Sequence, residues 1–484
     1  MNFSDPKFLY LFLPIVLGAY LILPKKAALV VLLIASTVFL GIAQPYYLVF
    51  FLSFIIANYF LGRLIQSCRD SENYWSKLIV WGAVGINAAL LLLFKLAPQF
   101  LASTTNPLVV AEVIRIPDPD PDWIFPLAFS YISFQVISYH IDIFNEITDA
   151  ENNLIRFANY ILFFPKMMVG PIQRYADDQD ALRDPAKSLG SASAGLRRFI
   201  VGLSKKVIIA DTLAVYVNAV FSFDDPTLNT SHAWLMLFAM VVQLYVDFSG
   251  YSDMAIGLAE VLGFKYRENF NYPYLATSVA EFWRRWHVSL TSWFRDYIFT
   301  PLQFAIRKQK WIPKFLPILV VFFLTGFWHG KENHYLVWGS VLGIAISIES
   351  GKFGKYLKKL PVAIQRVWTL YWILGSWVLF RSPNVSFSIG YLKNLVGIQG
   401  TVPLRAFSES RPYPIFQNSF YFSIIVGVIL MFPVSQIVQK HLEGKPRLLK
   451  FASYLRDFAL LLLLIYSMGL IANQGPLPGI YEKF

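Results

Sequence analysis

Long, almost uninterrupted apolar runs are the feature that most constrains what this 484-residue chain can fold into. Phe8 to Leu23, Ala27 to Ala43, Leu78 to Leu96 and Leu455 to Ala472 contain very few charged side chains. A helix of roughly 20 apolar residues crosses a bilayer core about 30 Å thick. Only 15% of the residues are charged, whereas a soluble domain carries about a quarter. The pattern predicts an all-α polytopic membrane protein and excludes a soluble enzyme, a nucleic-acid-binding protein and a disordered chain.

The apolar runs divide into candidate membrane spans. Twelve are found, near 8–23, 27–43, 46–61, 78–98, 123–144, 199–221, 233–262, 315–330, 335–350, 367–380, 419–439 and 457–473. We therefore expect about 11–12 transmembrane helices in a single membrane domain over 1–484. In this division 1–98 supplies N-terminal helices, 123–350 the helices that carry most of the sequence motifs, and 367–484 C-terminal helices.

The basic residues indicate the side of the membrane on which each loop lies. When the loops between the spans are assigned alternately to the two sides, most of the 42 Lys and Arg residues fall on the same side. Loops rich in Lys and Arg stay in the cytoplasm. We therefore expect a multi-pass protein with both termini on the extracytoplasmic side.

Two further hydrophobic stretches are predicted not to cross the membrane. Leu154 to Ile172 contains Pro165, Gly170 and Pro171, which interrupt helices. We expect a re-entrant segment there, buried against other helices. The stretch Glu281 to Tyr297 places aromatic residues at helical spacing with arginines between them. That pattern predicts a helix lying at the cytoplasmic interface.

The span over 233–262 carries polar side chains that a simple anchor would lack. Gln243, Asp247 and Tyr251 are four residues apart and share one helix face, and Asp253 follows them. An ionisable side chain at the bilayer centre costs about 2.5–3.5 kcal/mol on insertion scales, so each is a functional candidate. Two interpretations remain open: a polar seam that hydrogen-bonds to neighbouring helices, and a face lining a wet cavity.

The histidines and the single cysteine give little support to a metal site. Cys68 falls in a short charged stretch, where we interpret it as a loop thiol, and one cysteine excludes a disulfide framework. His329 and His334 do not have the i,i+4 spacing of a helical ligand pair, so we expect no bound metal. From the residues alone, His329 is either a satisfied buried histidine or a catalytic base.

Several motifs carry a family resemblance. Phe327-Trp328-His329-Gly330, followed by Trp338-Gly339, resembles the histidine motif of the membrane-bound O-acyltransferase (MBOAT) family. Other segments resemble its bacterial alginate O-acetyltransferase (AlgI-like) branch in the same order. They are Phe134 to Tyr139, Phe164 to Arg174, Gly195 to Phe199 with Gly202 to Val207, Asp247 to Asp253, Phe282 to Leu290 and Trp293 to Tyr297.

The resemblance implies a helical bundle around a central tunnel, in the plasma (inner) membrane of a bacterium. His329 would be the catalytic histidine, acting as a general base, and His287 a second functional histidine on the cytoplasmic side. The acyl donor would be a cytoplasmic thioester, either acyl-CoA or an acyl-carrier protein, with no bound cofactor. Expected partners are membrane lipid and periplasmic or extracellular acetyl-transfer proteins, and no nucleic acid.

Further site candidates follow from these roles. The predicted tunnel and substrate residues are Gln243, Asp247, Tyr251, Asp253, Trp328 and Asp296. The predicted contacts to donor phosphates are Lys205, Lys206, Arg284, Arg285 and Arg295. The alternative for these basic residues is binding to anionic lipid headgroups.

The leading functional hypothesis is transfer of an acetyl group for O-acetylation of an exported polysaccharide, alginate-type or another exopolysaccharide. Peptidoglycan O-acetylation and D-alanylation of teichoic acid fit the same mechanism. A hypothesis of another class is a non-catalytic transporter of acyl groups or lipid-linked sugars. It explains intramembrane Asp247 and Asp253 equally well, but it does not predict an indispensable His329.

Overall fold

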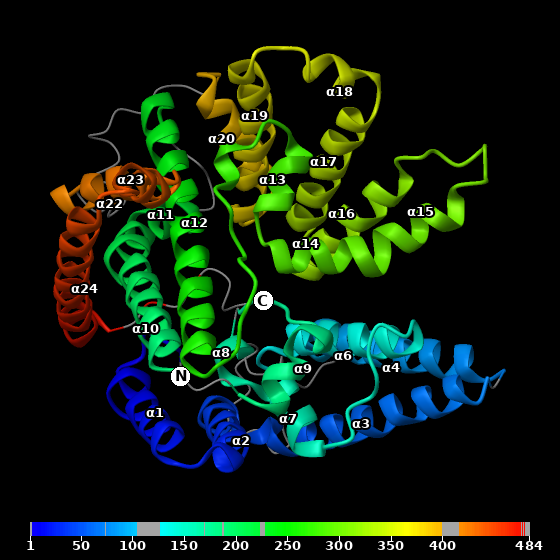
Figure 1. Cartoon of the computed structure of the whole chain (residues 1–484). Helices are drawn as coiled ribbons and strands as arrows, with labels where there is room; N and C mark the ends of the chain where they lie inside the picture. Colours follow the sequence, from blue (N-terminus) through cyan, green and yellow to red (C-terminus); the bar gives the residue numbers. More distant parts are fainter. Residues whose placement is uncertain are drawn as a thin grey trace. The chain divides into compact units, whose positions relative to one another are not determined.

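In the computed structural model the described part of the chain is mainly α-helical, with short 3-10 and π-helical segments (Figure 1). The structure describes residues 2–72, 74–103, 126–168, 170–185, 188–222, 228–398, 416–475, 477 and 479. In this part of the chain, extended pairing is limited to an isolated bridge between Phe270 and Trp286. Two compact units are formed: unit 1 from the described residues of 1–199 and 252–267, and unit 2 from those of 200–251 and 268–480.

Unit 1 is built around α6, whose side chains are buried along nearly its whole length. Its hydrophobic core includes a cluster of phenylalanines in which the rings of Phe12 and Phe164 lie 5.4 Å apart, edge to face. The helices are η1 (Phe8–Phe12), α1 (Leu13–Ile22), α2 (Lys25–Ala43), η2 (Pro45–Tyr47), α3 (Leu48–Asp70), α4 (Ser76–Ser103), α6 (Phe129–Phe144), α7 (Leu154–Leu162), α8 (Phe164–Met167) and α9 (Tyr175–Arg183). Two longer helices, α10 (Leu189–Ser204) and α12 (Thr230–Val261), contribute residues to both units.

Unit 2 contains both histidines of interest. It begins with a π-helical turn, η4 (Lys205–Ala210), which continues α10 into α11 (Asp211–Phe221). The remaining helices are η5 (Pro273–Leu275), α13 (Val279–Arg285), α14 (Val288–Phe294), η6 (Arg295–Phe299), α15 (Thr300–Ile306), α16 (Leu316–His329), α17 (Asn333–Ser350), α18 (Lys352–Leu357), α19 (Val362–Arg381), α20 (Val385–Leu395), α22 (Asn418–Leu430), α23 (Val434–Leu442) and α24 (Pro446–Gln474).

Helices lie in all twelve predicted spans as far as the structure describes them, which confirms the all-α fold of the described residues. Residues 123–125 of the predicted span 123–144 lie outside the described residues. Their lengths differ from the prediction. Within the described residues, four helices are long and apolar enough to cross a membrane: Pro45–Asp70, Ser76–Leu96, Thr230–Val261 and Pro446–Asn473. The pair α22 and α23 passes only together and is bent by 59°. The expected total of 11–12 crossings stays a prediction.

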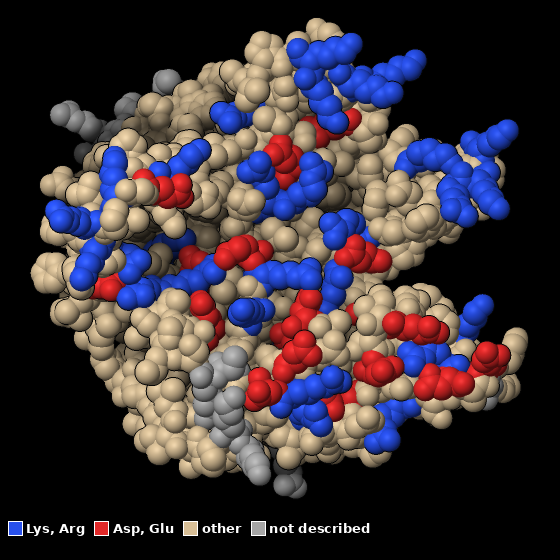
Figure 2. All heavy atoms as spheres, in the orientation of Figure 1, with Lys and Arg blue, Asp and Glu red and all other residues tan. Residues whose placement is uncertain are grey.

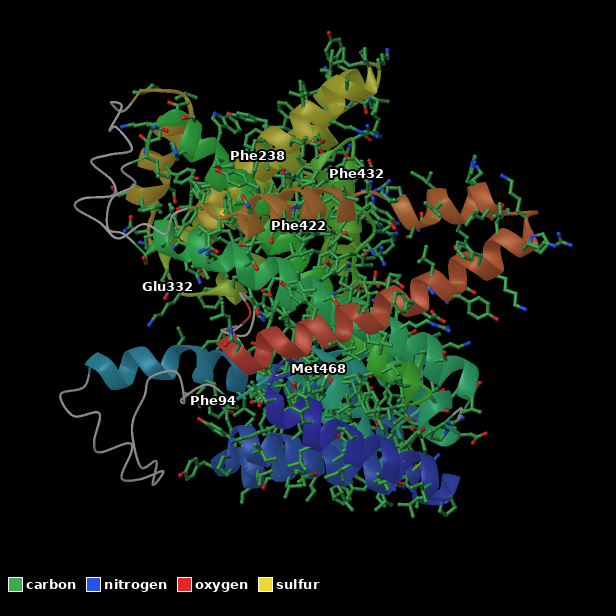
Figure 3. All side chains as sticks on the ribbon, turned by 90° about the vertical axis from the view of Figure 1, so that its left-hand side faces the viewer. Phe94, Phe238, Glu332, Phe422, Phe432 and Met468 are labelled. Carbon is green, nitrogen blue, oxygen red and sulfur yellow. The ribbon has the colours of Figure 1, made fainter. Side chains whose placement is uncertain are left out.

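Helices of unit 2 expose large apolar side chains, as a lipid-facing surface requires. Phe422 on α22 is 55% exposed, and Phe432, at the bend before α23, is 47% exposed (Figure 3). Little of the apolar stretch of α24 is buried, at 17%. In water such surfaces would be unstable, so they agree with a membrane environment.

The broken segment expected over Leu154 to Ile172 is confirmed. Helix α7 ends at Leu162, Phe163 is not helical, and Pro165 lies in the first turn of α8. The side chains from Phe157 to Met167 are buried. Whether the segment enters the membrane stays a prediction.

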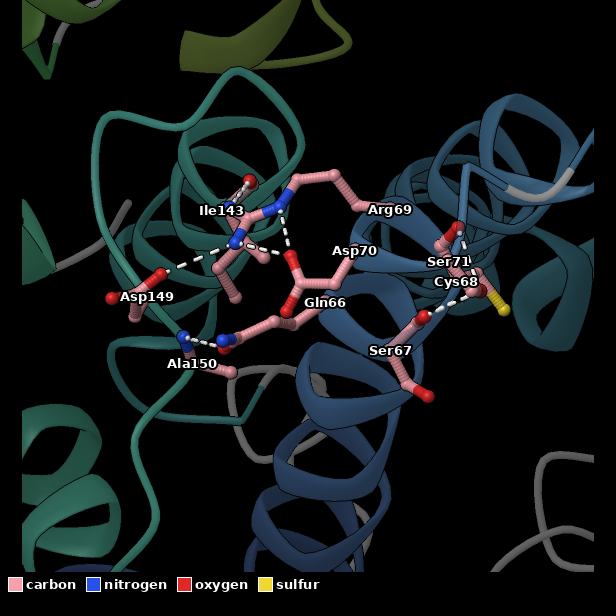
Figure 4. A network of polar contacts seen from close by, with 9 residues as sticks. All are labelled: Gln66, Ser67, Cys68, Arg69, Asp70, Ser71, Ile143, Asp149 and Ala150. Carbon is pink, nitrogen blue, oxygen red and sulfur yellow. Dashed lines mark hydrogen bonds and ion pairs between the residues drawn. The ribbon is translucent and has the colours of Figure 1, made fainter.

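Two other expectations are wrong. The continuous helix over Glu281 to Tyr297 is interrupted at Trp286 and His287, and three of its aromatic side chains, on Trp283, Trp286 and Trp293, are buried rather than arranged on an interfacial face. Cys68 lies in the last turn of α3, not in a loop (Figure 4). Beside it, Arg69 donates to the carbonyl oxygen of Ile143 at 2.7 Å, which ties α3 to the end of α6.

Candidate active site

His329 is positioned by the antiparallel hairpin of α16 and α17. The two helices cross closely because glycines face each other: a Cβ at Gly339 would lie 2.3 Å from the carbonyl oxygen of Phe322, and a Cβ at Gly326 would lie 2.5 Å from that of Tyr335. His329 is the last residue of α16, one turn beyond Gly326. The close crossing therefore fixes the backbone from which the imidazole projects.

The imidazole of His329 lies within an aromatic enclosure and is 5% exposed. Trp338 and Phe380 present their rings at right angles to it, with centroids 5.1 and 5.0 Å away. The predicted substrate residue Trp328 is its immediate neighbour, at 4.6 Å. The indole N–H of Trp338 is buried and has no acceptor among the described residues.

His287 lies at the break between α13 and α14. Its backbone adopts a left-handed conformation with φ of 45°, an uncommon one for a residue other than glycine, and its side chain is 1% exposed. The edge-on ring of Phe248 on α12 packs against it, 4.7 Å between centroids. Burial lowers the pKa of His287 to about 3, so this imidazole is neutral at physiological pH.

A run of aromatic side chains connects the surroundings of the two histidines within unit 2. From His329 it passes through Phe380 to Trp377 at 5.6 Å, and from there to Trp286 at 4.9 Å. Trp286 then contacts Phe248, the residue that packs on His287. Both imidazoles therefore border the same run of aromatic side chains.

A carboxylate on the polar face of α12 pairs with a lysine of unit 2. The carboxylate of Asp247 lies 3.1 Å from the ammonium of Lys206, which also pairs with Asp211. All three side chains are largely buried. The side-chain oxygen of Gln243 has no partner among the described residues. Tyr251, two turns beyond Gln243, is buried as well.

Asp253 belongs to unit 1, where Arg198 on α10 binds its carboxylate at 2.9 Å. The helices α10 and α12 approach closely there, because Gly195 and Gly257 face each other's backbone. The intramembrane carboxylates of Asp247 and Asp253 therefore each have a cationic partner, as the polar-seam interpretation requires.

The predicted donor-phosphate residues divide into two groups. Lys205 and Lys206 start η4, and Lys206 is only 2% exposed. The arginines belong to the segment from α13 to η6, where Arg285 pairs with Glu281 at 2.7 Å and Arg295 with the predicted substrate residue Asp296 at 2.8 Å. Arg284 is exposed. The roles assigned to these residues stay predictions.

The residues that the sequence analysis missed include two polar ones, besides the aromatic residues Phe248, Trp377 and Phe380. Glu349, at the end of α17, accepts hydrogen bonds from the backbone N–H groups of Val279 and Ala280 at 2.8 and 3.1 Å, and so caps α13. Asn269 contacts His287 from a neighbouring loop. Neither contact has a local sequence signal, because each joins residues far apart in the chain. The described residues hold no group of three or more His, Cys, Asp or Glu side chains able to bind a metal ion.

Comparison with known proteins places this helical membrane protein among the acyltransferases. Residues 148–356 match the membrane-bound O-acyltransferase family, MBOAT. The chain is 34% identical over 385 residues to the probable alginate O-acetylase AlgI of Pseudomonas aeruginosa. The aligned region covers 80% of this chain and 73% of that protein. It is 30% identical over 440 residues to the peptidoglycan O-acetyltransferase of Helicobacter pylori, covering 82% and 80%.

A more distant similarity, 29% over 248 residues, relates it to the teichoic acid D-alanyltransferase of Bacillus subtilis, with 49% of this chain and 62% of that protein covered. The chain belongs to the membrane-bound O-acyltransferase family, and it is an O-acyltransferase.

Proposed function

We propose that this protein transfers an acetyl group from a cytoplasmic thioester for the O-acetylation of an exported polysaccharide, alginate-type or another exopolysaccharide. The observation that carries the proposal is the buried, aromatically enclosed His329 at the end of α16, in a chain similar to alginate O-acetylases over 80% of its length. The donor is acyl-CoA or an acyl-carrier protein.

His329 acts in this proposal as the general base. A neutral imidazole accepts the proton of an attacking hydroxyl as its oxygen bonds to the thioester carbonyl carbon. Collapse of the tetrahedral intermediate breaks the carbon–sulfur bond, and the departing thiolate recovers the proton from the imidazolium. A positioned base of this kind contributes about 10²–10⁴-fold to the rate.

The tetrahedral intermediate carries an oxyanion, which needs hydrogen-bond donors. The indole N–H of Trp338 is one available donor, because its ring packs on His329 and it lacks an acceptor among the described residues. Trp328, next to His329, offers another indole, and backbone N–H groups or the amide of Gln243 are alternatives. The run of aromatic side chains that both histidines border supports the proposal further, because exclusion of water protects a thioester from hydrolysis.

The direction of transfer is part of the proposal. A tunnel through the bundle would admit the donor from the cytoplasm and deliver the acetyl group to the opposite side, where periplasmic or extracellular partner proteins receive it. Arg284, Arg285 and Arg295 would contact donor phosphates more readily than Lys206, because Lys206 is buried against Asp211 and Asp247. The protein would reside in the plasma (inner) membrane with both termini outside the cytoplasm.

The test is the acetyl-ester content of isolated cell-envelope and secreted glycans from wild-type, deletion and His329→Ala strains, at equal protein level. We expect the esters of one glycan to disappear in both mutants. That glycan then identifies the acceptor pathway. Esters that persist in His329→Ala but vanish in the deletion strain would refute the role of His329.

The alternatives give other outcomes in the same experiment. Loss of acetyl esters from peptidoglycan alone would indicate peptidoglycan O-acetylation, and loss of D-alanyl esters would indicate teichoic acid D-alanylation. A transporter would leave the product of His329→Ala unchanged, whereas Asp247 variants would alter it. The pairing of Asp247 with Lys206 and of Asp253 with Arg198 favours the enzyme, because those carboxylates already have structural partners.

A further inference from the structure

The loop before α13 lies beside the break that carries His287, and backbone hydrogen bonds hold the two together. The N–H of Asn271 donates to the carbonyl oxygen of Arg285 at 2.9 Å, and the N–H of Val288 donates to that of Asn269 at 3.0 Å. Between these bonds lies the antiparallel bridge of Phe270 and Trp286. Asn269 is thereby fixed opposite His287, and it is 1% exposed.

The side-chain oxygen of Asn269 is a shared acceptor. It receives the backbone N–H of Ser289 at 3.2 Å and the hydroxyl of Ser289 at 3.0 Å. A backbone N–H only donates, so the atom that faces it must be the amide oxygen and not the amide nitrogen. The orientation of the Asn269 amide is therefore determined.

This orientation decides the tautomer of His287. Its Nδ1 lies 3.3 Å from the same oxygen of Asn269 and 3.4 Å from the hydroxyl oxygen of Ser289. The nearer neighbour of Nδ1, the amide oxygen of Asn269, presents a lone pair, and the hydroxyl oxygen of Ser289 presents another when that hydroxyl donates to Asn269. Only a protonated Nδ1 is attracted by them. The other ring nitrogen, Nε2, then carries the lone pair of the neutral imidazole.

We propose that Asn269 is a positioning residue that holds His287 as the neutral Nδ1–H tautomer, with Nε2 as its proton or hydrogen-bond acceptor. The proposal rests on the proposed function, and on the family resemblance that implies a functional role for His287. It adds that this role belongs to Nε2 and depends on an amide from a separate loop. The left-handed backbone at His287 agrees with it, because uncommon conformations of this kind gather where a side chain must be held in one place.

The first test reads the tautomer directly and does not depend on activity. Protein labelled with ¹⁵N at the histidine rings is examined by NMR in lipid, and His287→Gln identifies the resonances of His287. We expect a directly bonded proton on Nδ1 and none on Nε2. Asn269→Leu, of similar size but without an acceptor, should lose that signature, whereas Asn269→Asp, which keeps the acceptor oxygen, should retain it. A wild-type protein with the proton on Nε2 would overturn the proposal.

The second test measures acetyl esters formed in cells that express each variant at equal level. Asn269→Leu should lower ester formation by about 10–100-fold, the effect that losing an orienting partner has on metal-bound histidines, and Asn269→Asp should restore most of it. Asn394→Leu, which changes another buried asparagine of unit 2, is the control and should leave ester formation unchanged. Equal loss in Asn269→Asp and Asn269→Leu would indicate a merely structural role for Asn269.

The two tests separate this inference from the proposed function. If His287→Gln leaves ester formation intact, the functional role of His287 fails, but the NMR result still decides whether Asn269 sets its tautomer. If the tautomer is as expected and both His287→Gln and Asn269→Leu lose activity, both statements stand.

Discussion

Lys206 illustrates how a single buried residue acquires two different interpretations. By sequence it is a basic residue beside a helix end, suited to a phosphate. In the structure its ammonium lies between the carboxylates of Asp211 and Asp247, at a π-helical turn. Charges are buried only when they are paired, since the cost of removing them from water is large. A structural role is therefore sufficient to explain Lys206.

Substitution of Lys206 tests this interpretation. Lys206→Met removes the cation from two buried carboxylates, so we expect the free energy of unfolding to fall by about 3–5 kcal/mol, measured by denaturant unfolding in detergent. The double change Lys206→Met with Asp247→Asn should recover part of the loss. Lys308→Met, at an exposed position, is the control. A Lys206→Met protein of normal stability that forms no acetyl ester would instead support a contact with the donor.

At the scale of helices, the sequence predicts a helix break best when the residues that cause the break lie within the segment itself. The break in Leu154 to Ile172 follows from prolines and a glycine inside the segment itself, and the structure shows it. The break at His287 follows from pairing with the loop of Asn269 and Asn271, which no periodicity within Glu281 to Tyr297 reveals. The aromatic spacing there correctly indicates helical structure on both sides of the break, but it does not tell whether protein or membrane covers the aromatic side chains.

The same distinction holds for the candidate site. His329 was recognisable from its motif, and so was Trp338, because both lie within a dozen residues on one hairpin. Phe380 belongs to α19 and reaches His329 only through tertiary packing. The ion pair of Lys206 with Asp247 joins two helices in the same way. Such contacts require the three-dimensional arrangement.

The close crossing of α16 and α17 gives a prediction for these elements. In Gly339→Ala the new methyl group would lie 2.3 Å from the carbonyl oxygen of Phe322, so the helices must separate and His329 must move. We expect a loss of about 1–3 kcal/mol of stability and a severe loss of acetyl esters. The matched control is Gly375→Ala on α19, where a Cβ meets nothing within 4 Å. Wild-type ester content in a stable Gly339→Ala protein would contradict the positioning role of this crossing.

For the whole molecule, the orientation in the membrane rests on the distribution of charge. Lys and Arg side chains gather on the turn between α15 and α16, residues 307–315 (Figure 2). There the ammonium of Lys314 donates to the carbonyl oxygens of Ile306 and Arg307 at 3.2 and 2.9 Å, which closes the turn, and Trp311 is 82% exposed. A basic turn with an exposed tryptophan is suited to the headgroup region of the cytoplasmic leaflet, where anionic lipids attract Lys and Arg.

Cysteine labelling tests this orientation, because the chain has one cysteine, Cys68, that Cys68→Ser removes. In that background Trp311→Cys should react with a membrane-impermeant maleimide only after the cells are permeabilised, since its loop is predicted to be cytoplasmic. Lys7→Cys, at an exposed position near the N-terminus, should react in spheroplasts without permeabilisation. Labelling in the opposite pattern would reverse the topology. The thioester would then have to reach His329 from the end of the bundle that the charge distribution assigns to the outside, and transfer from a cytoplasmic donor would no longer hold.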